Sequence, residues 1–220
     1  MVLSRFLEML APVNCLGCGF EGAVVCTTCL DSLSTPNQAL CYVCGRASKG
    51  GRTCELCARG NALSGVSVGA GYDGPVKELI LRLKFHRLRA ATDTAADLLM
   101  RAAGDWPEVQ LITSVPVAPS RHRERGYNQS ELLARVVASR TGLPYRPLIG
   151  RLTTTHQIGL DRRTRLDQVA GAFYASRRLE GHSVLVVDDV VTTGATVSAC
   201  AEVLRGAGAG LVWAAAVARH

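Results

Sequence analysis

The sequence has no apolar run near the roughly 20 residues that a membrane-spanning helix needs. Its longest candidate, LVWAAAVA at residues 211–218, has the length of a strand. The first ten residues, MVLSRFLEML, have Glu8 inside their apolar stretch and no small-residue cleavage site, so they predict an amphipathic helix and not an export signal. A content of 48% hydrophobic and 20% charged residues shows no disorder signature. We therefore expect a cytoplasmic, globular protein with no membrane span.

Two common kinds of catalytic motif are also missing. The segment TTGAT at residues 192–196 has no lysine and not the spacing of a nucleoside-triphosphate P-loop, which excludes that site. No convincing Ser/His/Asp or Cys/His nucleophile is present. His86, His122, His156 and His182 are dispersed, and each is better interpreted as a surface or loop histidine.

Cysteine, by contrast, is concentrated at one end. Eight of the nine cysteines precede residue 58, as four Cys-x-x-Cys pairs, and Cys200 is predicted to be a small core residue. Repeated pairs without an export signal favour zinc over a disulfide framework. The spacing fits two sequential four-thiolate sites, although interleaved pairing is also compatible, so we expect one or two structural Zn²⁺ ions. The predicted ligands are Cys15, Cys18, Cys26, Cys29, Cys41, Cys44, Cys54 and Cys57.

Positive charge is concentrated in another segment. The chain has a net charge of +7, and residues 115–168 contain ten arginines against four acidic residues. An anionic ligand is therefore expected to meet this segment and not the cysteine-rich head.

The chain divides into a loop-like, metal-dependent head at residues 1–60 and a larger domain at residues 61–220. In the larger domain, apolar patterns predict strands at residues 67–72, 109–117, 171–176, 182–189 and 210–218. Helical spacing predicts helices at residues 76–85, 91–103, 128–142 and 195–208. Alternating strands and helices, with strands apolar on both faces, predict an α/β fold with a parallel sheet flanked by helices.

The stretch VVDDVVTTGAT at residues 186–196 combines a buried strand, two aspartates and a small hydroxyl-rich loop. The start of a helix after a parallel strand suits a phosphate, because its backbone N–H groups lack partners. Adjacent carboxylates accept hydrogen bonds from sugar hydroxyls, and a divalent metal would further offset their charge. A turn capped by two aspartates is the simpler alternative, but the whole pattern favours a sugar-phosphate site.

Residues 184–196 resemble the signature of type I phosphoribosyltransferases, which bind phosphoribosyl pyrophosphate (PRPP). The segments VPVAPSRHRERGYNQ (115–129) and HQIGLDRRTRLDQVAGAF (156–173), together with the cysteine-rich head, resemble the ComF/GntX family. This resemblance covers nearly the whole chain. It implies a type I phosphoribosyltransferase fold behind a double zinc ribbon, with Mg²⁺ as the partner of PRPP.

The resemblance also implies site residues. Asp188 and Asp189 would contact the ribose hydroxyls. The 5′-phosphate loop would comprise Val191, Thr192, Thr193, Gly194, Ala195 and Thr196. The pyrophosphate loop and flap would comprise Arg121, Arg125, Asn128, Gln129, Gln157, Arg162 and Arg165. Gln168 stands where the family usually has asparagine, which changes the reach of that amide.

Three hypotheses for function follow. The first is an active phosphoribosyltransferase that transfers a phosphoribosyl group from PRPP to an acceptor. The second is a non-catalytic sensor of PRPP or a related phosphosugar. The third, implied by the family's link to competence, is an adaptor in DNA uptake that binds single-stranded DNA or DNA-uptake proteins. The composition of the zinc head favours a structural docking module, because the head lacks clustered Arg and Lys and its candidate stacking groups, Phe20 and Tyr42, are few.

Overall fold

A computed structural model describes residues 13–85, 89–102, 106, 108–152 and 171–220. The expected N-terminal helix lies outside these residues. No helix among the described residues has both the length and the apolar character needed to cross a bilayer.

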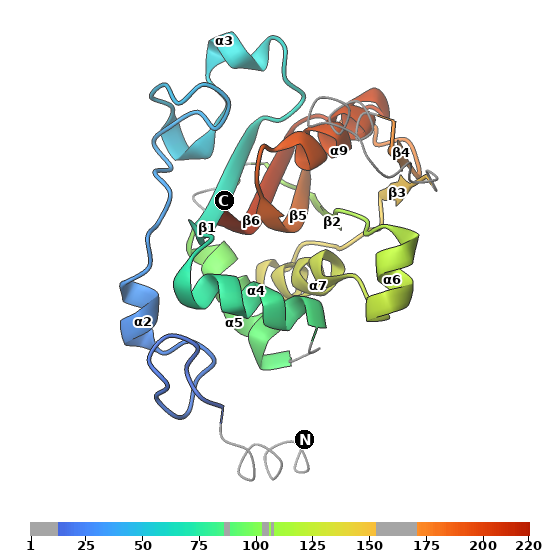
Figure 1. Cartoon of the computed structure of the whole chain (residues 1–220). Coiled ribbons are helices and arrows are strands. Elements are labelled where there is room, and N and C mark those ends of the chain that lie inside the picture. The colour runs from blue at the N-terminus through green and yellow to red at the C-terminus, as the bar shows by residue number, and fades with distance from the viewer. Residues whose placement is uncertain (1–12, 86–88, 103–105, 107, 153–170) are drawn as a thin grey trace, which may run out of the picture.

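A four-stranded sheet forms the centre of the larger domain, and all its neighbouring strands are parallel (Figure 1). In spatial order the strands are β1 (Gly65–Gly71), β6 (Val212–Arg219), β5 (Val184–Val191) and β2 (Leu111–Ser114). This confirms the predicted parallel sheet. The predicted strand at 109–117 is shorter than expected, and the one at 182–189 extends further, to Val191.

Helices cover both faces of the sheet, as Figure 1 shows. They are α4 (Gly74–Phe85), α5 (Arg89–Arg101) and α7 (Gln129–Thr141) on one face and α9 (Ala195–Gly206) on the other. Alternate residues of β5 separate the two cores: Leu185 and Val187 pack with the first group of helices, and Val184 and Val186 pack with α9. Burial on both faces explains why β5 and β6 are continuous apolar runs.

A small second sheet and a short helix lie beside the large sheet. The predicted strand at 171–176 is β4 (Phe173–Ala175), which pairs antiparallel with β3 (Ile149–Arg151) in a separate small sheet beside α9. A short helix, α6 (Pro119–Arg125), follows β2 and was not predicted. Arg151 of β3 and Arg121 of α6 line the same cavity.

The described part of the cysteine-rich head, from Val13 on, contains three short helices and runs along β1 (Figure 1). They are α2 (Thr27–Asp31), η1 (Lys49–Gly51) and α3 (Glu55–Ala58). The backbone N–H of Gly71 donates to the Ser34 carbonyl at 2.9 Å, and Gln38 Nε2 donates to the Val68 carbonyl at 2.9 Å. The head thus covers the exposed edge of β1, which would otherwise be open to pairing with another strand.

Candidate functional site

The eight head cysteines form two four-sulfur clusters. In each cluster every Sγ atom lies within 4.8 Å of the others. One contains Cys15, Cys18, Cys26 and Cys29, and the other contains Cys41, Cys44, Cys54 and Cys57. The sequential pairing is therefore correct, and the interleaved alternative is not. We name them the first and the second cysteine cluster.

Their geometry suits tetrahedral zinc. A Zn–S distance of about 2.3 Å separates tetrahedral sulfurs by about 3.8 Å, and the Cys18–Cys26 and Cys44–Cys54 Sγ pairs lie 3.6 Å apart. Burial raises the pKa of the Cys15 thiol, but backbone N–H groups donating to its sulfur lower that pKa overall to about 6. The hydrogen bond with Cys26 is the main cause that raises the pKa of Cys29 to about 12. Four crowded sulfurs cannot all ionise without a cation, so both clusters are consistent with structural zinc sites.

The two aspartates are the last residues of the predicted strand at 182–189, whereas in the structure β5 continues past them to Val191. Asp188 is in register with Ala216 of β6, and both aspartates are buried. On the other side β2 stops at Ser114, opposite Val187. Among the described residues the aspartates therefore have a paired strand on one side only, and the sheet opens toward the segment after β2.

Asp188 is held by two hydrogen bonds to the same oxygen. Ser130 Oγ donates to Asp188 Oδ1 at 2.8 Å, and the backbone N–H of Asp189 donates to it at 2.9 Å. Burial raises the pKa of Asp188 well above its usual value, and the charge of Asp189 raises it further. The folded state therefore maintains a carboxyl group whose ionisation opposes stability.

This arrangement predicts that Asp188→Asn stabilises the free protein at neutral pH. Because folding raises the pKa of Asp188, ionisation of this group makes the folded protein less stable as pH rises from the unfolded pKa through the folded one. Asparagine retains the Oδ1 acceptor and removes the buried charge. We expect the variant to melt a few degrees higher than the parent at pH 7, because each kcal/mol of stability corresponds to about 2–4 °C for a chain of this size. This gain in melting temperature should shrink as pH falls toward 4. Calorimetry of both proteins between pH 5 and 8 measures the difference. A variant less stable than the parent at every pH contradicts this assignment.

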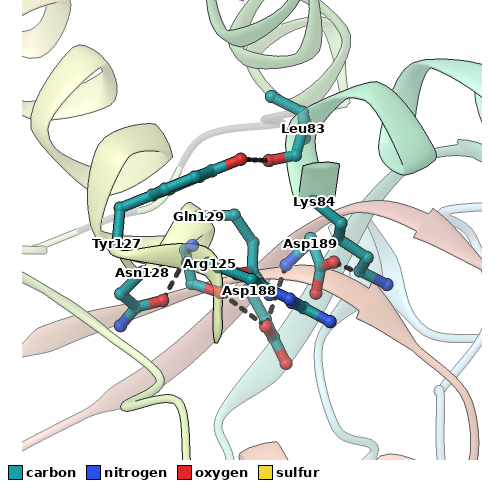
Figure 2. A network of polar contacts seen from close by, with 9 residues as sticks. Leu83, Lys84, Arg125, Tyr127, Asn128, Gln129, Asp188 and Asp189 are labelled. Carbon is teal, nitrogen blue, oxygen red and sulfur yellow. Dashed lines mark hydrogen bonds and ion pairs between the residues drawn. The ribbon is translucent and has the colours of Figure 1, made fainter. Parts of the chain in front are cut away.

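Asp189 pairs with a residue that was not predicted. Lys84 Nζ lies 2.9 Å from Asp189 Oδ2, at the end of α4 (Figure 2). The preceding residue, Leu83, accepts a hydrogen bond through its carbonyl from the Tyr127 hydroxyl. The turn before α7 is therefore tied to the turn that carries Lys84.

The loop after β5 leads into the N-terminus of α9, and its binding of an anion stays a prediction. Gly194 caps the N-terminus of α9 with φ of 81°, a left-handed conformation that favours glycine. Thr192 and Thr196 line the adjoining cavity, while the Thr193 hydroxyl accepts a long hydrogen bond from the Ala195 N–H at 3.4 Å. The Val191 side chain is buried in the core, so only its backbone is available to a ligand.

A cavity of about 500 Å³ brings these groups together. Besides the Asp pair and the threonines, its polar lining consists of Tyr72, Lys84, Arg121, Asn128, Gln129, Ser130, Arg151 and His220. Predicted residues from the arginine-rich segment and the Asp-Asp segment thus meet in one space. Gln157, Arg162 and Arg165 lie outside the described residues.

Two predicted residues have clear roles in holding the segment before α7. Asn128 Oδ1 accepts from the Ser130 N–H at 3.1 Å, and its Nδ2 donates to the Val115 carbonyl at 2.9 Å. Arg125 donates to Gln129 Oε1 at 3.1 Å. Asn128 therefore caps α7 and orients Ser130 toward the aspartates, and its contact with a ligand stays a prediction.

Arg151 of β3 was not predicted, although it lines the cavity together with Arg121 of α6. It is half-buried, and the central carbon of its guanidinium lies 5.2 Å from the Phe173 ring centroid. Burial lowers the pKa of Arg151, and the charge of Arg121 lowers it further. A bound anion would relieve both effects, so this end of the cavity favours a negatively charged group.

Comparison with known families and proteins shows the same two parts. A double zinc ribbon model matches residues 6–58, and a phosphoribosyl transferase domain model matches residues 111–220. The chain is 31% identical over 215 residues to DNA utilization protein YhgH of Salmonella typhi, across 86% of this chain and 93% of that protein. The chain belongs to the ComF/YhgH family.

The chain is also similar to a further relative and to solved structures. Competence protein F of Haemophilus influenzae is 28% identical, across 82% of this chain and 90% of that protein. Among solved structures, glutamine PRPP amidotransferase from B. subtilis matches with a TM-score of 0.43 and 23% identity, across 61% of this chain but 30% of that one. Adenine phosphoribosyltransferase from Thermoanaerobacter pseudethanolicus matches with a TM-score of 0.37 and 17% identity, across 63% of this chain and 71% of that one. The division of this chain at residue 60 stays a prediction.

Proposed function

We propose that this ComF/YhgH family member binds PRPP and transfers its phosphoribosyl group to an acceptor nucleophile. The observation that supports this most is the single cavity in which the buried Asp pair, the Gly194 loop and the Arg121–Arg151 pair face one another. Each group matches a different part of PRPP. The helix N-terminus suits the 5′-phosphate, the carboxylates suit the ribose hydroxyls, and the guanidiniums suit the pyrophosphate.

In this proposal, the chain contributes mainly positioning and charge. Attack at the anomeric carbon breaks the bond to pyrophosphate, and the developing negative charge on the leaving group is stabilised by Arg121 and Arg151. The carboxylates of Asp188 and Asp189 supply oxygen ligands of the kind that Mg²⁺ prefers, so the cavity suits this ion. Bound Mg²⁺ would add positive charge beside the pyrophosphate.

The direct test is pyrophosphate release from PRPP, measured across nucleobases, amines and single-stranded DNA as acceptors. Turnover with one acceptor class supports a transferase and names its substrate. Binding of PRPP without turnover across the set would instead identify a PRPP sensor. If the protein neither binds PRPP nor turns it over, that result would contradict the site assignment.

A role in DNA utilisation is a second part of the proposal, supported by the names of the relatives from Salmonella typhi and Haemophilus influenzae. If Arg121 and its neighbours bind a DNA backbone, the affinity for DNA should fall steeply between 50 and 200 mM salt. For a site with many phosphate contacts the expected loss is about 10³-fold or more. Titration with labelled single-stranded DNA at several salt concentrations measures this. A flat salt response would argue against a backbone-binding role for these arginines.

We further expect Arg151→Met to weaken PRPP binding while leaving the free protein at least as stable. Methionine keeps much of the apolar stem and removes a half-buried charge whose ionisation the surroundings oppose. Loss of charge-assisted hydrogen bonds should weaken binding roughly 10- to 100-fold. Isothermal titration with PRPP and Mg²⁺ measures the change. Arg146→Met, at an exposed position outside the cavity, is the matched control and should bind like the parent.

A further inference from the structure

The zinc ribbon touches the proposed phosphate loop through one side chain. Tyr42 directly follows Cys41, a buried member of the second cysteine cluster. Its ring lies against Gly194, because a Cβ placed on that glycine would be 3.1 Å from Tyr42 Cε2. The Tyr42 ring of the head therefore lies beside the glycine that shapes the loop and leaves little room there for a side chain.

Polar contacts fix the same ring. The hydroxyls of Tyr42 and Ser198 lie 3.2 Å apart, and Asn61 Nδ2 lies 3.3 Å from the Tyr42 hydroxyl. Ser198 belongs to the first turn of α9, where its backbone N–H donates to the Gly194 carbonyl at 2.9 Å. Tyr42 thus contacts both ends of this turn, with its ring at Gly194 and its hydroxyl at Ser198.

Tyr42 does not line the cavity that holds the Asp pair. It instead packs with the hydrophobic core that includes Val197 and Cys200 of α9. Its contacts support the loop from the side away from the cavity, so Tyr42 acts through the loop and not on a ligand.

We propose that Tyr42 is a positioning residue through which the second cysteine cluster, when it holds its metal, keeps the loop at residues 192–196 in shape for a phosphate. Metal at this cluster fixes Cys41, Cys41 fixes the adjacent Tyr42, and Tyr42 restrains Gly194 and Ser198. In the part of the chain that the structure describes, the first cysteine cluster has no such path, because Cys15, Cys26 and Cys29 pack with the core on the opposite face of the sheet. Loss of metal from the second cluster should therefore loosen the loop, and loss from the first should not.

The first arm of the test needs no ligand. Amide hydrogen exchange at residues 192–198 is measured in the parent, Tyr42→Phe and Tyr42→Ala. We expect exchange about 5-fold or more faster in Tyr42→Ala and an intermediate rate in Tyr42→Phe, which keeps the ring and loses the hydroxyl. Val43→Ala, at the exposed neighbouring position, is the control and should exchange like the parent.

The metal path is tested with a matched pair of exposed ligands. Cys44→Ser weakens the second cluster and Cys18→Ser weakens the first. Only Cys44→Ser should speed exchange in the loop, with zinc content measured in both. Equal loop exchange in Tyr42→Ala and the parent, or equal effects of the two cysteine variants, would overturn the proposal. If Tyr42→Ala loses zinc or unfolds, Ser198→Ala removes the same hydroxyl contact from the loop side and must give faster exchange than the parent.

The second arm rests on the proposed function. Tyr42→Ala should weaken binding of ribose 5-phosphate by about 5-fold or more and change binding of inorganic pyrophosphate little, because Arg121 and Arg151 lie elsewhere in the cavity. A general loss of structure would weaken both ligands together and would contradict the positioning role. If exchange responds as expected but the parent binds neither ligand, the proposed function fails while the contact between cluster and loop stands.

Discussion

The Asp188→Asn/Asp189→Asn variant is expected to lose all thermal stabilisation by PRPP and Mg²⁺. Ligand at a hundred times its Kd stabilises a protein by about 2.7 kcal/mol. For a chain of this size that energy corresponds to a rise in melting temperature of about 5–10 °C. The double variant removes the carboxylate charge that suits the ribose hydroxyls and the metal, and it replaces one acceptor oxygen at each position by an NH2 donor. Melting curves with and without millimolar PRPP measure the loss.

A control separates this effect from a general change in charge. Asp93 and Asp97 pair with Arg140 on the surface, and their side chains are more than half exposed. Asp93→Asn/Asp97→Asn makes the same charge change away from the cavity and should keep the full ligand-induced shift. Stabilisation that persists in the cavity variant would contradict the assignment of the Asp pair.

The free double variant also gives an internal check on folding. Asp188→Asn alone is expected to raise stability at neutral pH, whereas removing Asp189 leaves Lys84 without its ion pair. The two changes therefore act in opposite directions on the free protein. A double variant that remains folded but no longer responds to PRPP would show that these carboxylates serve binding at some expense of stability.

Local patterns predicted the regular part of the fold. Apolar spacing located α4, α7 and α9, and continuous apolar runs located β5 and β6, because these elements bury the faces that the patterns mark. The cysteine clusters were equally readable, since Cys-x-x-Cys spacing has few structural alternatives. In each case neighbouring residues in the sequence carry the information.

The missed features depend on contacts between distant segments. Lys84 lies on an amphipathic helix and had no local sign of its pairing with Asp189. Arg151 belongs to a three-residue strand, too short for any periodicity. The end of β5 was misplaced because adjacent charges normally end a buried strand, whereas pairing with β6 continues it to Val191. Of these missed features, only α6 could have been predicted from local residues, because Pro119 lies in its first turn and Gly126 is its left-handed C-cap.

Removal of zinc is expected to have the second large effect, because the head has little core of its own. Its buried residues Cys15, Val24 and Val25 pack into the same core as α4 and α5. Structural zinc contributes about 10–16 kcal/mol to small modules. Chelation should release about two zinc ions per chain and lower the melting temperature by at least about 10 °C. A metal indicator counts the ions, and calorimetry gives the stability.

Chelation should also change how the protein associates. The head covers the β1 edge through the Gly71–Ser34 and Gln38–Val68 hydrogen bonds, and loss of the head would expose backbone groups that can pair with another chain. We therefore expect concentration-dependent association after chelation, measured by light scattering, and its reversal when zinc is restored. Cys18→Ser and Cys44→Ser should each release one ion and associate less than the fully chelated chain. Complete release without a change in stability would mean that packing against the sheet, and not metal, folds the head; that result would leave the contact between Tyr42 and Gly194 in place without zinc.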